Sequence, residues 1–511
     1  MGLLTEDDLD TEQQRAVRAI RRGDTNVLLF GPGGSGKTAV ANIALHGQLG
    51  IRSAVATTVA RRFGGSDGVN TQELLSVVRQ HGMPKPHRYV ESNPTCRKIF
   101  GFDGALNTGK PFFIAIDEAG QVSGEHLYHI VDALWHACAK LPNPLMRFSR
   151  ITWVLLGDPE RQLPNISGKE LLKSAIFDAH PSNFGKRVWC GQLSGKHRFR
   201  RECREYVDHI EWAFQQYNRG FLETIVKQAK ARYREFMTTG RIFWVQHFVA
   251  TRAEAETYLA KAAAHIFGAA ATTLCARPPD TLSEKQARSS EYTSASYIFS
   301  GDPSVLTVVE TTVSGKNLVA TSCENPDVTV PVANRTEFVI DRDAITDFPD
   351  EYPSRQSSCT LSVHIDGVGD CTIPMFHFNK DGGSQPIFRQ IGWRNDEGVT
   401  LTAVRLLFNA QGFQYNGQKI VVGSEHCNAP ITGTFAYVAL TRSNDPNNVL
   451  FAPSLKVEFS TADEKRRKAT RELIAQFNDG SRKKSQARAA PPRKRRRLSC
   501  NLPPMRPSSS A

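Results

Sequence analysis

The segment Gly31-Pro32-Gly33-Gly34-Ser35-Gly36-Lys37-Thr38 decides the fold of this chain. It fits G-x-x-x-x-G-K-[ST], the phosphate-binding loop, and the apolar runs on either side, Val27–Phe30 and Ala39–Leu45, predict a strand before it and a helix after it. Glycines let the backbone wrap closely around phosphate oxygens, and the N–H groups that open the helix attract the anion. We expect Lys37 to reach the β and γ phosphates and the Thr38 hydroxyl to hold Mg²⁺. A glycine-rich turn with a chance lysine is the alternative.

Composition indicates a globular protein of several domains. The chain has 511 residues, of which 40% are hydrophobic. No apolar run approaches the roughly 20 residues that span a bilayer, and the first residues lack the layout of a secretory signal, so we expect no membrane partner. The 10 cysteines are scattered without a C-x-x-C pair, which argues against a structural zinc site or a disulfide framework.

The net charge of +13 lies in one place. Residues 465–511 hold 15 Lys and Arg against 2 Asp and Glu, which accounts for the whole excess. The rest of the chain is formally neutral, so a nucleic-acid groove there would be a local basic patch.

The first part of the chain predicts an α/β domain. Residues 1–185 alternate strand-like and helical patterns, the rhythm of βαβ units in a parallel sheet. Glycine, proline and histidine interrupt it over 64–110, which suggests an inserted subdomain or a long loop.

The remainder predicts a second α/β domain that is itself interrupted. Residues 186–280 look mostly helical, with a strand expected in Arg241–Thr251 and a helix in Ala253–Phe267, and 401–460 return to the α/β style. Residues 281–400 are rich in Val, Thr, Gly and Asp and predict a small all-β insertion. From 461 to 511 the composition predicts a disordered basic tail.

A second apolar strand supplies carboxylates for catalysis. Phe112–Ile116 ends in Asp117 and Glu118, so both acids should lie at the carboxyl edge of the sheet, beside the phosphates. We expect Asp117 to hold Mg²⁺, directly or through water, and Glu118 to orient the attacking water. An Asp-Glu pair at a helix N-terminus is the plainer alternative.

A third apolar strand, Ile151–Leu156, ends in Gly157-Asp158-Pro159-Glu160-Arg161-Gln162-Leu163-Pro164. Gln162 is placed to read the γ-phosphate and report its loss, although Gly-Asp-Pro is also ordinary turn chemistry.

These ordered motifs resemble those of a superfamily 1 helicase. Leu9–Val17 resembles the glutamine motif, which implies that Gln13 reads the adenine edge, and Val55–Gly65 resembles motif Ia, which lies against nucleic acid. Leu193–Arg200 resembles motif IV, whose γ-phosphate arginine matches Arg198 best and Arg200 second. The core of motif V matches Gln411 and Gly412. Motif VI matches Tyr437–Arg442, which implies that Arg442 is the arginine finger; a surface arginine after a strand is the alternative.

The pattern is most similar to the Pif/RecD-like branch. That resemblance implies two RecA-like domains with ATP and Mg²⁺ between them, single-stranded DNA across the top, an SH3-like barrel in the β insertion and 5′-to-3′ travel. The motifs IDEA, GDP and ALTR are also similar to those of compact viral helicases that act on RNA. Before Gln411 the usual Thr-x-His-Lys-x is replaced by Leu406-Leu407-Phe408-Asn409-Ala410.

Three functions remain open on the sequence. The chain is an ATP-dependent helicase or translocase on single-stranded or duplex DNA, an RNA helicase, or a nucleotide-switched binding protein that never unwinds. Basic and aromatic residues are the candidates for binding a nucleic-acid strand. They are Arg61, Arg62, Phe63, His81, Lys85 and His87. For the histidines an ordinary solvated role is the stronger interpretation.

The end of the chain carries a compact basic run, Arg493-Lys494-Arg495-Arg496-Arg497, after two prolines. It resembles a nuclear localisation signal, so we expect an import receptor as partner and the nucleus, a host nucleus for a viral protein, as location. A nonspecific phosphate-binding arm would have the same composition. The sequence leaves the oligomeric state open.

Overall fold

The computed structural model describes residues 4–55, 60, 63–64, 68–81, 94–161, 171–173, 187–239, 241, 243–278, 295–312, 318–332, 335–353, 358–378, 384–407, 414–415, 417–423 and 430–478. Within these ranges no helix is long and apolar enough to cross a bilayer. Several predicted positions lie outside the described residues: Arg61, Arg62, Lys85, His87, Gln162, Gln411, Gly412 and Arg493–Arg497.

The first domain is built on a six-stranded sheet in which every pair of neighbours is parallel, as predicted. In spatial order its strands are β3 (Val69–Asn70), β2 (Gly50–Ala54), β4 (Phe112–Asp117), β5 (Ile151–Gly157), β1 (Asn26–Phe30) and β6 (Val188–Gln192). The three central strands are buried along their whole length, which explains their continuous apolar sequences.

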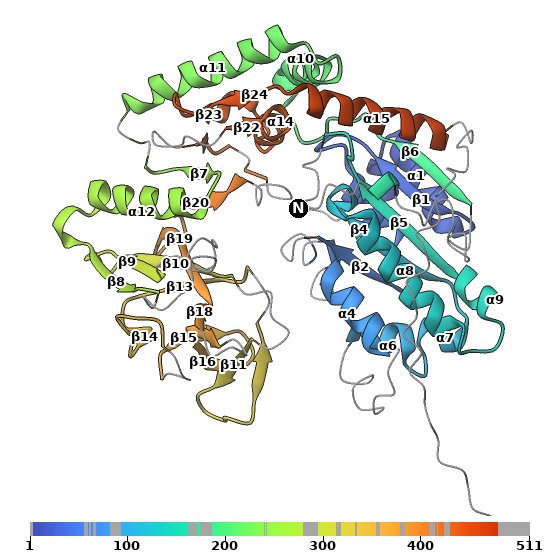
Figure 1. Ribbon diagram of the computed structural model, residues 1–511, viewed down its shortest axis with the longest axis horizontal. Helices are drawn as coiled ribbons and strands as arrows, with labels where there is room; N and C mark the ends of the chain where they lie inside the picture. The colour runs from blue at the N-terminus through green and yellow to red at the C-terminus, as the bar shows by residue number, and fades with distance from the viewer. Residues whose placement is uncertain are drawn as a thin grey trace, which may run out of the picture.

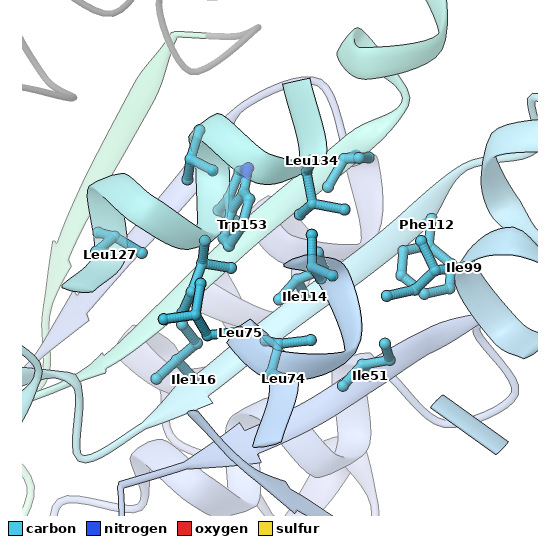
Figure 2. Packing of buried hydrophobic residues seen from close by; sticks show 14 of the residues in the cluster. Ile51, Leu74, Leu75, Ile99, Phe112, Ile114, Ile116, Leu127, Leu134 and Trp153 are labelled. Carbon is cyan, nitrogen blue, oxygen red and sulfur yellow. The ribbon is translucent and has the colours of Figure 1, made fainter. Parts of the chain in front are cut away.

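Helices cover both faces of this sheet. On one face lie α1 (Thr11–Arg22) and α2 (Lys37–Ala44), packed on Val27, Phe113 and Val154. On the other lie α4 (Thr71–His81), α6 (Pro94–Phe100), α7 (Ala105–Thr108), α8 (Gly124–Cys138) and α9 (Pro144–Ser149). Figure 2 shows the core of this second face, where Leu74 and Leu134 pack over Ile114 and Trp153. The described part of the 64–110 interruption, residues 64, 68–81 and 94–110, is therefore largely a helical layer of the first domain.

The second domain is built on a seven-stranded sheet. Its parallel half is β20 (Thr400–Leu406), β7 (Gln246–Val249), β21 (Ile420–Val422) and β23 (Val449–Phe451). The helices of this domain are α10 (Arg204–Gln215), α11 (Arg219–Met237), α12 (Arg252–Ile266) and α14 (Gly433–Leu440), and a short parallel pair joins β22 (Ile431–Thr432) to β24 (Val457–Glu458). The expected strand near 246 and helix near 253 are confirmed.

In the described residues of the β-rich insertion every regular element is a strand, as predicted, but the insertion is not a separate unit. Three of its strands, β13 (Glu337–Ile340), β10 (Val305–Thr311) and β19 (Phe388–Asn395), continue the second sheet through antiparallel pairing with β20. A five-stranded antiparallel sheet lies beyond them, formed by β12 (Thr329–Pro331), β11 (Val319–Ser322), β16 (Gly369–Pro374), β15 (Thr360–Ile365) and β14 (Ile345–Thr346). Two antiparallel strand pairs accompany these sheets, β8 (Thr272–Ala276), which precedes the insertion, with β9 (Ala295–Phe299), and β17 (Phe376–Phe378) with β18 (Ser384–Pro386). In Figure 1 the insertion lies at the lower left, below α12.

Two predicted boundaries are wrong. The first domain does not end at 185, because β6 (Val188–Gln192) pairs with β1 in the first sheet. The tail does not begin at 461, because residues Thr461–Asn478 form a helix, α15, on which Arg467 and Thr470 are buried. The basic composition of this helix suggested disorder, but its buried arginine has partners far away in the sequence.

Candidate active site

The phosphate-binding loop joins β1 to α2, and its glycines are required by geometry. Gly34 and Gly36 have φ angles of 88° and 85°, in the left-handed region that other residues avoid. A Cβ placed on Gly34 would lie 2.5 Å from the Cβ of Arg198, and one on Gly36 would collide with the side-chain amide of Gln13. The loop is therefore a close-fitting cradle with side chains packed against its outer surface.

Lys37 and Thr38 open α2 directly after this cradle. The Lys37 ammonium donates hydrogen bonds to the carbonyls of Gly31 at 2.7 Å and Pro32 at 2.9 Å, so it lies across the mouth of the loop. The Thr38 hydroxyl donates to Asp117 Oδ2 at 2.8 Å. The predicted pair of magnesium ligands, one hydroxyl and one carboxylate, is thus adjacent in space although 79 positions apart in the chain.

Glu118 follows Asp117 at the carboxyl end of β4 in an unusual conformation. Its φ angle is 54°, and its backbone N–H donates to Asp117 Oδ1 at 2.8 Å. A left-handed conformation costs a non-glycine residue about 1–2 kcal/mol, and such strain concentrates at functional sites. The turn carries the Glu118 carboxylate past the sheet edge, where it interacts electrostatically with Lys37, Arg198 and Arg442.

The environment of Asp117 favours the binding of a cation beside its carboxylate. Burial and the neighbouring Glu118 carboxylate raise its pKa to about 6, although the hydrogen bond from Thr38 and the charge of Lys37 act in the opposite direction. A divalent cation beside a carboxylate favours its charged form. The oxygen donors of Asp117 and Thr38 are also those that Mg²⁺ prefers, so these residues fit the expected ion.

Two arginines approach the loop at a seam between the domains. A Cβ placed on Gly33 would lie 3.2 Å from Arg442 Nη2 and 3.3 Å from Arg198 Nη1. Arg442 follows α14 in the second domain and is buried, with Nε donating to Val438 O at 3.0 Å. Arg198 lies in the segment after β6 and donates from Nη1 to Thr441 O at 2.9 Å. Arg200 is exposed, so of the two motif IV candidates only Arg198 reaches the loop.

The cations of the seam are destabilised in their charged forms. Burial lowers the pKa of Lys37 and of Arg442 from their ordinary values, and burial together with the charge of Arg442 lowers the pKa of Arg198 to about 9. A multivalent anion in the cradle would compensate this crowding of buried positive charge. The arrangement is therefore one that favours a phosphate chain.

Gln13 lies against the loop rather than pointing freely into space. Its Nε2 donates to Ser35 O at 3.0 Å, while its Oε1 accepts from the backbone of Asp10 at 3.0 Å and closes the N-terminus of α1. Its proposed reading of adenine stays a prediction. His197, whose Nε2 lies within hydrogen-bond distance of Asp10 Oδ2 at 3.0 Å, is beside the same part of the loop.

The loop after β5 contributes charged residues that the sequence interpretation passed over. Arg161 forms a buried ion pair with Asp158 at 3.2 Å. Burial opposes the charge of Arg161, but Asp158, Tyr437, Glu160 and Glu211 together raise its pKa above the ordinary value. Tyr437 and Glu211 belong to the second domain and are hydrogen-bonded to each other at 3.3 Å. Because these partners come from distant segments, only the charge-rich GDPER sequence itself could have drawn attention to Arg161.

One proposed grip residue is corrected by the structure. Phe63 was expected to stack on nucleic-acid bases, but it is 1% exposed and packs in the core beneath α1 and α2. The sequence around it, Arg-Arg-Phe, suggested an exposed patch, whereas the ring fills space between helix and sheet. The side chain of His81 lies outside the described part of the chain.

The described residues form two α/β domains, with the phosphate-binding loop in the seam between them. No protein-family model and no curated protein matches the sequence. Among solved structures, a Pif1 helicase studied at forked double-stranded DNA superposes with a TM-score of 0.56 at 15% identity, over 91% of this chain and 97% of that one. Pif1 from Bacteroides in complex with ADP-AlF3 and single-stranded DNA gives 0.53 at 15% identity, over 91% and 97%. Pif1 from Candida albicans gives 0.51 at 14% identity, over 91% and 99%.

This likeness extends over nearly the whole of both chains. The protein therefore has the fold of the Pif1 helicases, and the expected α/β fold class is confirmed.

Proposed function

We propose that this protein is an ATP-dependent DNA helicase or translocase that hydrolyses ATP in the seam between its two domains. The observation that carries the proposal is the approach of Arg198 and Arg442 to Gly33, across the seam from Thr38 and Asp117. The solved structures with the same fold include Pif1 bound to single-stranded DNA and to ADP-AlF3. These complexes support ATP as the substrate and single-stranded DNA as the nucleic acid.

The chain's own residues divide the chemistry among them. The backbone N–H groups of the loop and Lys37 bind the phosphates, while Thr38 and Asp117 would hold Mg²⁺, which supplies charge neutralisation between phosphate oxygens. Glu118 orients the attacking water. Arg198 and Arg442 stabilise the charge that develops on the transferred group, a contribution of about 10³ to 10⁵ in rate in other phosphoryl-transfer enzymes.

Movement follows from the origin of these residues in different domains. Arg442 completes the site only when the second domain lies against the loop, so nucleotide favours the closed seam and loss of the γ-phosphate releases it. If the two domains hold the strand alternately, each cycle becomes one step along it. We propose the 5′-to-3′ direction on the resemblance of the motifs alone.

The first experiment is ATP hydrolysis by the full chain with single-stranded DNA, single-stranded RNA or neither. Stimulation by DNA supports the proposal, and stimulation by RNA alone would favour the viral type of helicase. Lys37→Ala serves as the control, because loss of the phosphate-facing ammonium should remove turnover. Displacement of a strand from duplexes with a 5′ or a 3′ overhang then reports unwinding and direction.

A switch that never unwinds is the second candidate, and one observation favours it. The strand β20 ends in Leu406, at the position where the motif resemblance would have the Thr of Thr-x-His-Lys-x before Gln411. Nucleotide hydrolysis without strand displacement, on either overhang, would select this candidate.

We also propose nuclear import through Arg493–Arg497. The support is the proline-flanked basic run in the sequence. Deletion of residues 490–511 should abolish nuclear accumulation of a fluorescent fusion; accumulation that persists would leave the basic run with a phosphate-binding role only.

A further inference from the structure

The helix α15 (Thr461–Asn478) contacts both domains behind the seam. Its apolar side chains Leu473 and Ile474 pack against the core of the first domain, and the helix lies beside β6. At its other end, the guanidinium of Arg467 lies 3.4 Å from the centroid of the Phe214 ring and donates a hydrogen bond to the Phe214 carbonyl. Phe214 belongs to α10 and to the core of the second domain. Figure 1 shows α15 in dark red, extending from α14 toward β6.

The same helix holds the loop that follows β5. Arg471 Nε lies 3.0 Å from Glu160 Oε1, and Arg467 Nη2 lies 3.9 Å from the same oxygen. Arg466 donates from Nη1 to Pro159 O at 3.5 Å. These contacts reach the segment that also carries Asp158, whose charge acts on Lys37 in the catalytic seam.

Arg467 and Glu160 are the buried charged groups of this contact, and burial raises the pKa of Glu160 above its ordinary value. Arg467 is 1% exposed, and burial lowers its pKa to about 10, which leaves it cationic at neutral pH. Desolvation makes a buried ion pair a weak source of stability, and hydrophobic replacements often stabilise a fold as well or better. The Arg467 guanidinium, stacked on the Phe214 ring and hydrogen-bonded to the Phe214 carbonyl, is better suited to fixing a position than to holding the fold together.

We infer that Arg467 is a positioning residue, which fixes Glu160 and the Gly157–Arg161 segment relative to Phe214 of the second domain. Through this contact α15 couples the state of the catalytic seam to the position of the second domain. The inference rests on the proposed function for its consequence in catalysis, but the contact itself can be tested without activity. Residues 461–478 would thus couple the catalytic seam to the second domain, a role distinct from that of the basic run Arg493–Arg497.

The test compares Arg467→Met with Lys468→Met in the full chain. Lys468 is the next residue on the same helix and is exposed, so its substitution removes one positive charge without touching the contact. Coupling free energies between sites are about 1–3 kcal/mol, so Arg467→Met should reduce the stimulation of ATP turnover by single-stranded DNA about 5-fold or more, with the KM for ATP unchanged. Lys468→Met should keep the stimulation of the unmodified protein. A normal stimulation ratio in Arg467→Met would overturn the inference.

Two further measurements keep the test decisive. Hydrogen exchange at the backbone of Gly157–Arg161 should quicken in Arg467→Met even if the protein hydrolyses nothing, so failure of the proposed function and failure of this inference give different results. If Arg467→Met does not fold, Glu160→Gln and Arg471→Ala replace it, since Arg471 is 41% exposed and tolerates truncation better. In a double-mutant cycle these two changes should not be additive. Additive effects, or unchanged exchange, would contradict the positioning role.

Discussion

Substitution of Gly34 by alanine tests two requirements of the loop at this position: a left-handed backbone conformation and free space beside Arg198. The φ angle of +88° imposes a strain of about 1–2 kcal/mol on any residue with a Cβ. The new Cβ would also lie 2.5 Å from the Cβ of Arg198, where ordinary contact begins at 3.4 Å. Arg198 must therefore retreat by about an ångström, and a misplacement of about 1 Å can reduce an enzymatic rate about 10²-fold.

Gly47 provides the matched control. Its φ angle of +69° imposes the same type of strain, but a Cβ there meets nothing within 4 Å. Both Gly34→Ala and Gly47→Ala should lower the thermal midpoint, by about 2–4 °C per kcal/mol for a domain of this size, and Gly34→Ala should lower it further because its Cβ also meets Arg198. Only Gly34→Ala should lose turnover, about 10²-fold, in a steady-state ATPase assay with single-stranded DNA. Full turnover in Gly34→Ala, or an equal loss in Gly47→Ala, would refute the role given to the Arg198 contact.

Three further outcomes are expected. Glu118→Gln should retain nucleotide binding and slow hydrolysis by about 10²–10⁴, because the base that orients water is lost; single-turnover kinetics measures this, and unchanged rates would remove Glu118 from the mechanism. Arg442→Ala should slow turnover about 10³-fold with little loss of nucleotide affinity, and a loss confined to affinity would argue against a finger role. His247 is buried and its pKa is lowered to about 3, so the unfolded chain takes up a proton below about pH 6.5 that the folded chain does not. Stability should fall by about 2 kcal/mol between pH 7 and pH 5 on this account, and urea titrations of His247→Gln should show a correspondingly smaller fall; an equal fall in both proteins would contradict it.

The parts of the site that depend on local sequence could be predicted. The cradle with Thr38 follows the carboxyl end of β1, and Asp117 lies at the carboxyl end of β4; both strands are parallel to β5, which lies between them, so their ends meet at the same edge of the sheet. Arg442 was identified by resemblance to motif VI, and the structure brings it to the loop. Its surroundings differ from the plain alternative, since it follows a helix and is buried.

The parts that depend on distant partners could not be predicted. The sequence of α15 is rich in Lys and Arg, and composition alone cannot reveal that Arg467 meets an aromatic ring 253 positions earlier. Phe63 was misassigned for the opposite reason, because two neighbouring arginines gave a buried ring the appearance of an exposed one. The edge strand β6 was assigned to the wrong domain because a short strand carries no mark of the sheet it will join.

The insertion shares strands with the second domain, and this has a mechanical consequence. An appendage attached by a single connecting peptide can swivel, whereas β19 is hydrogen-bonded to β20 across Gly392–Arg394 and also to β10. Any rotation that brings Arg442 to the cradle must therefore carry the whole insertion with it, as a stiff lever whose far end sweeps a longer arc than the catalytic residues do.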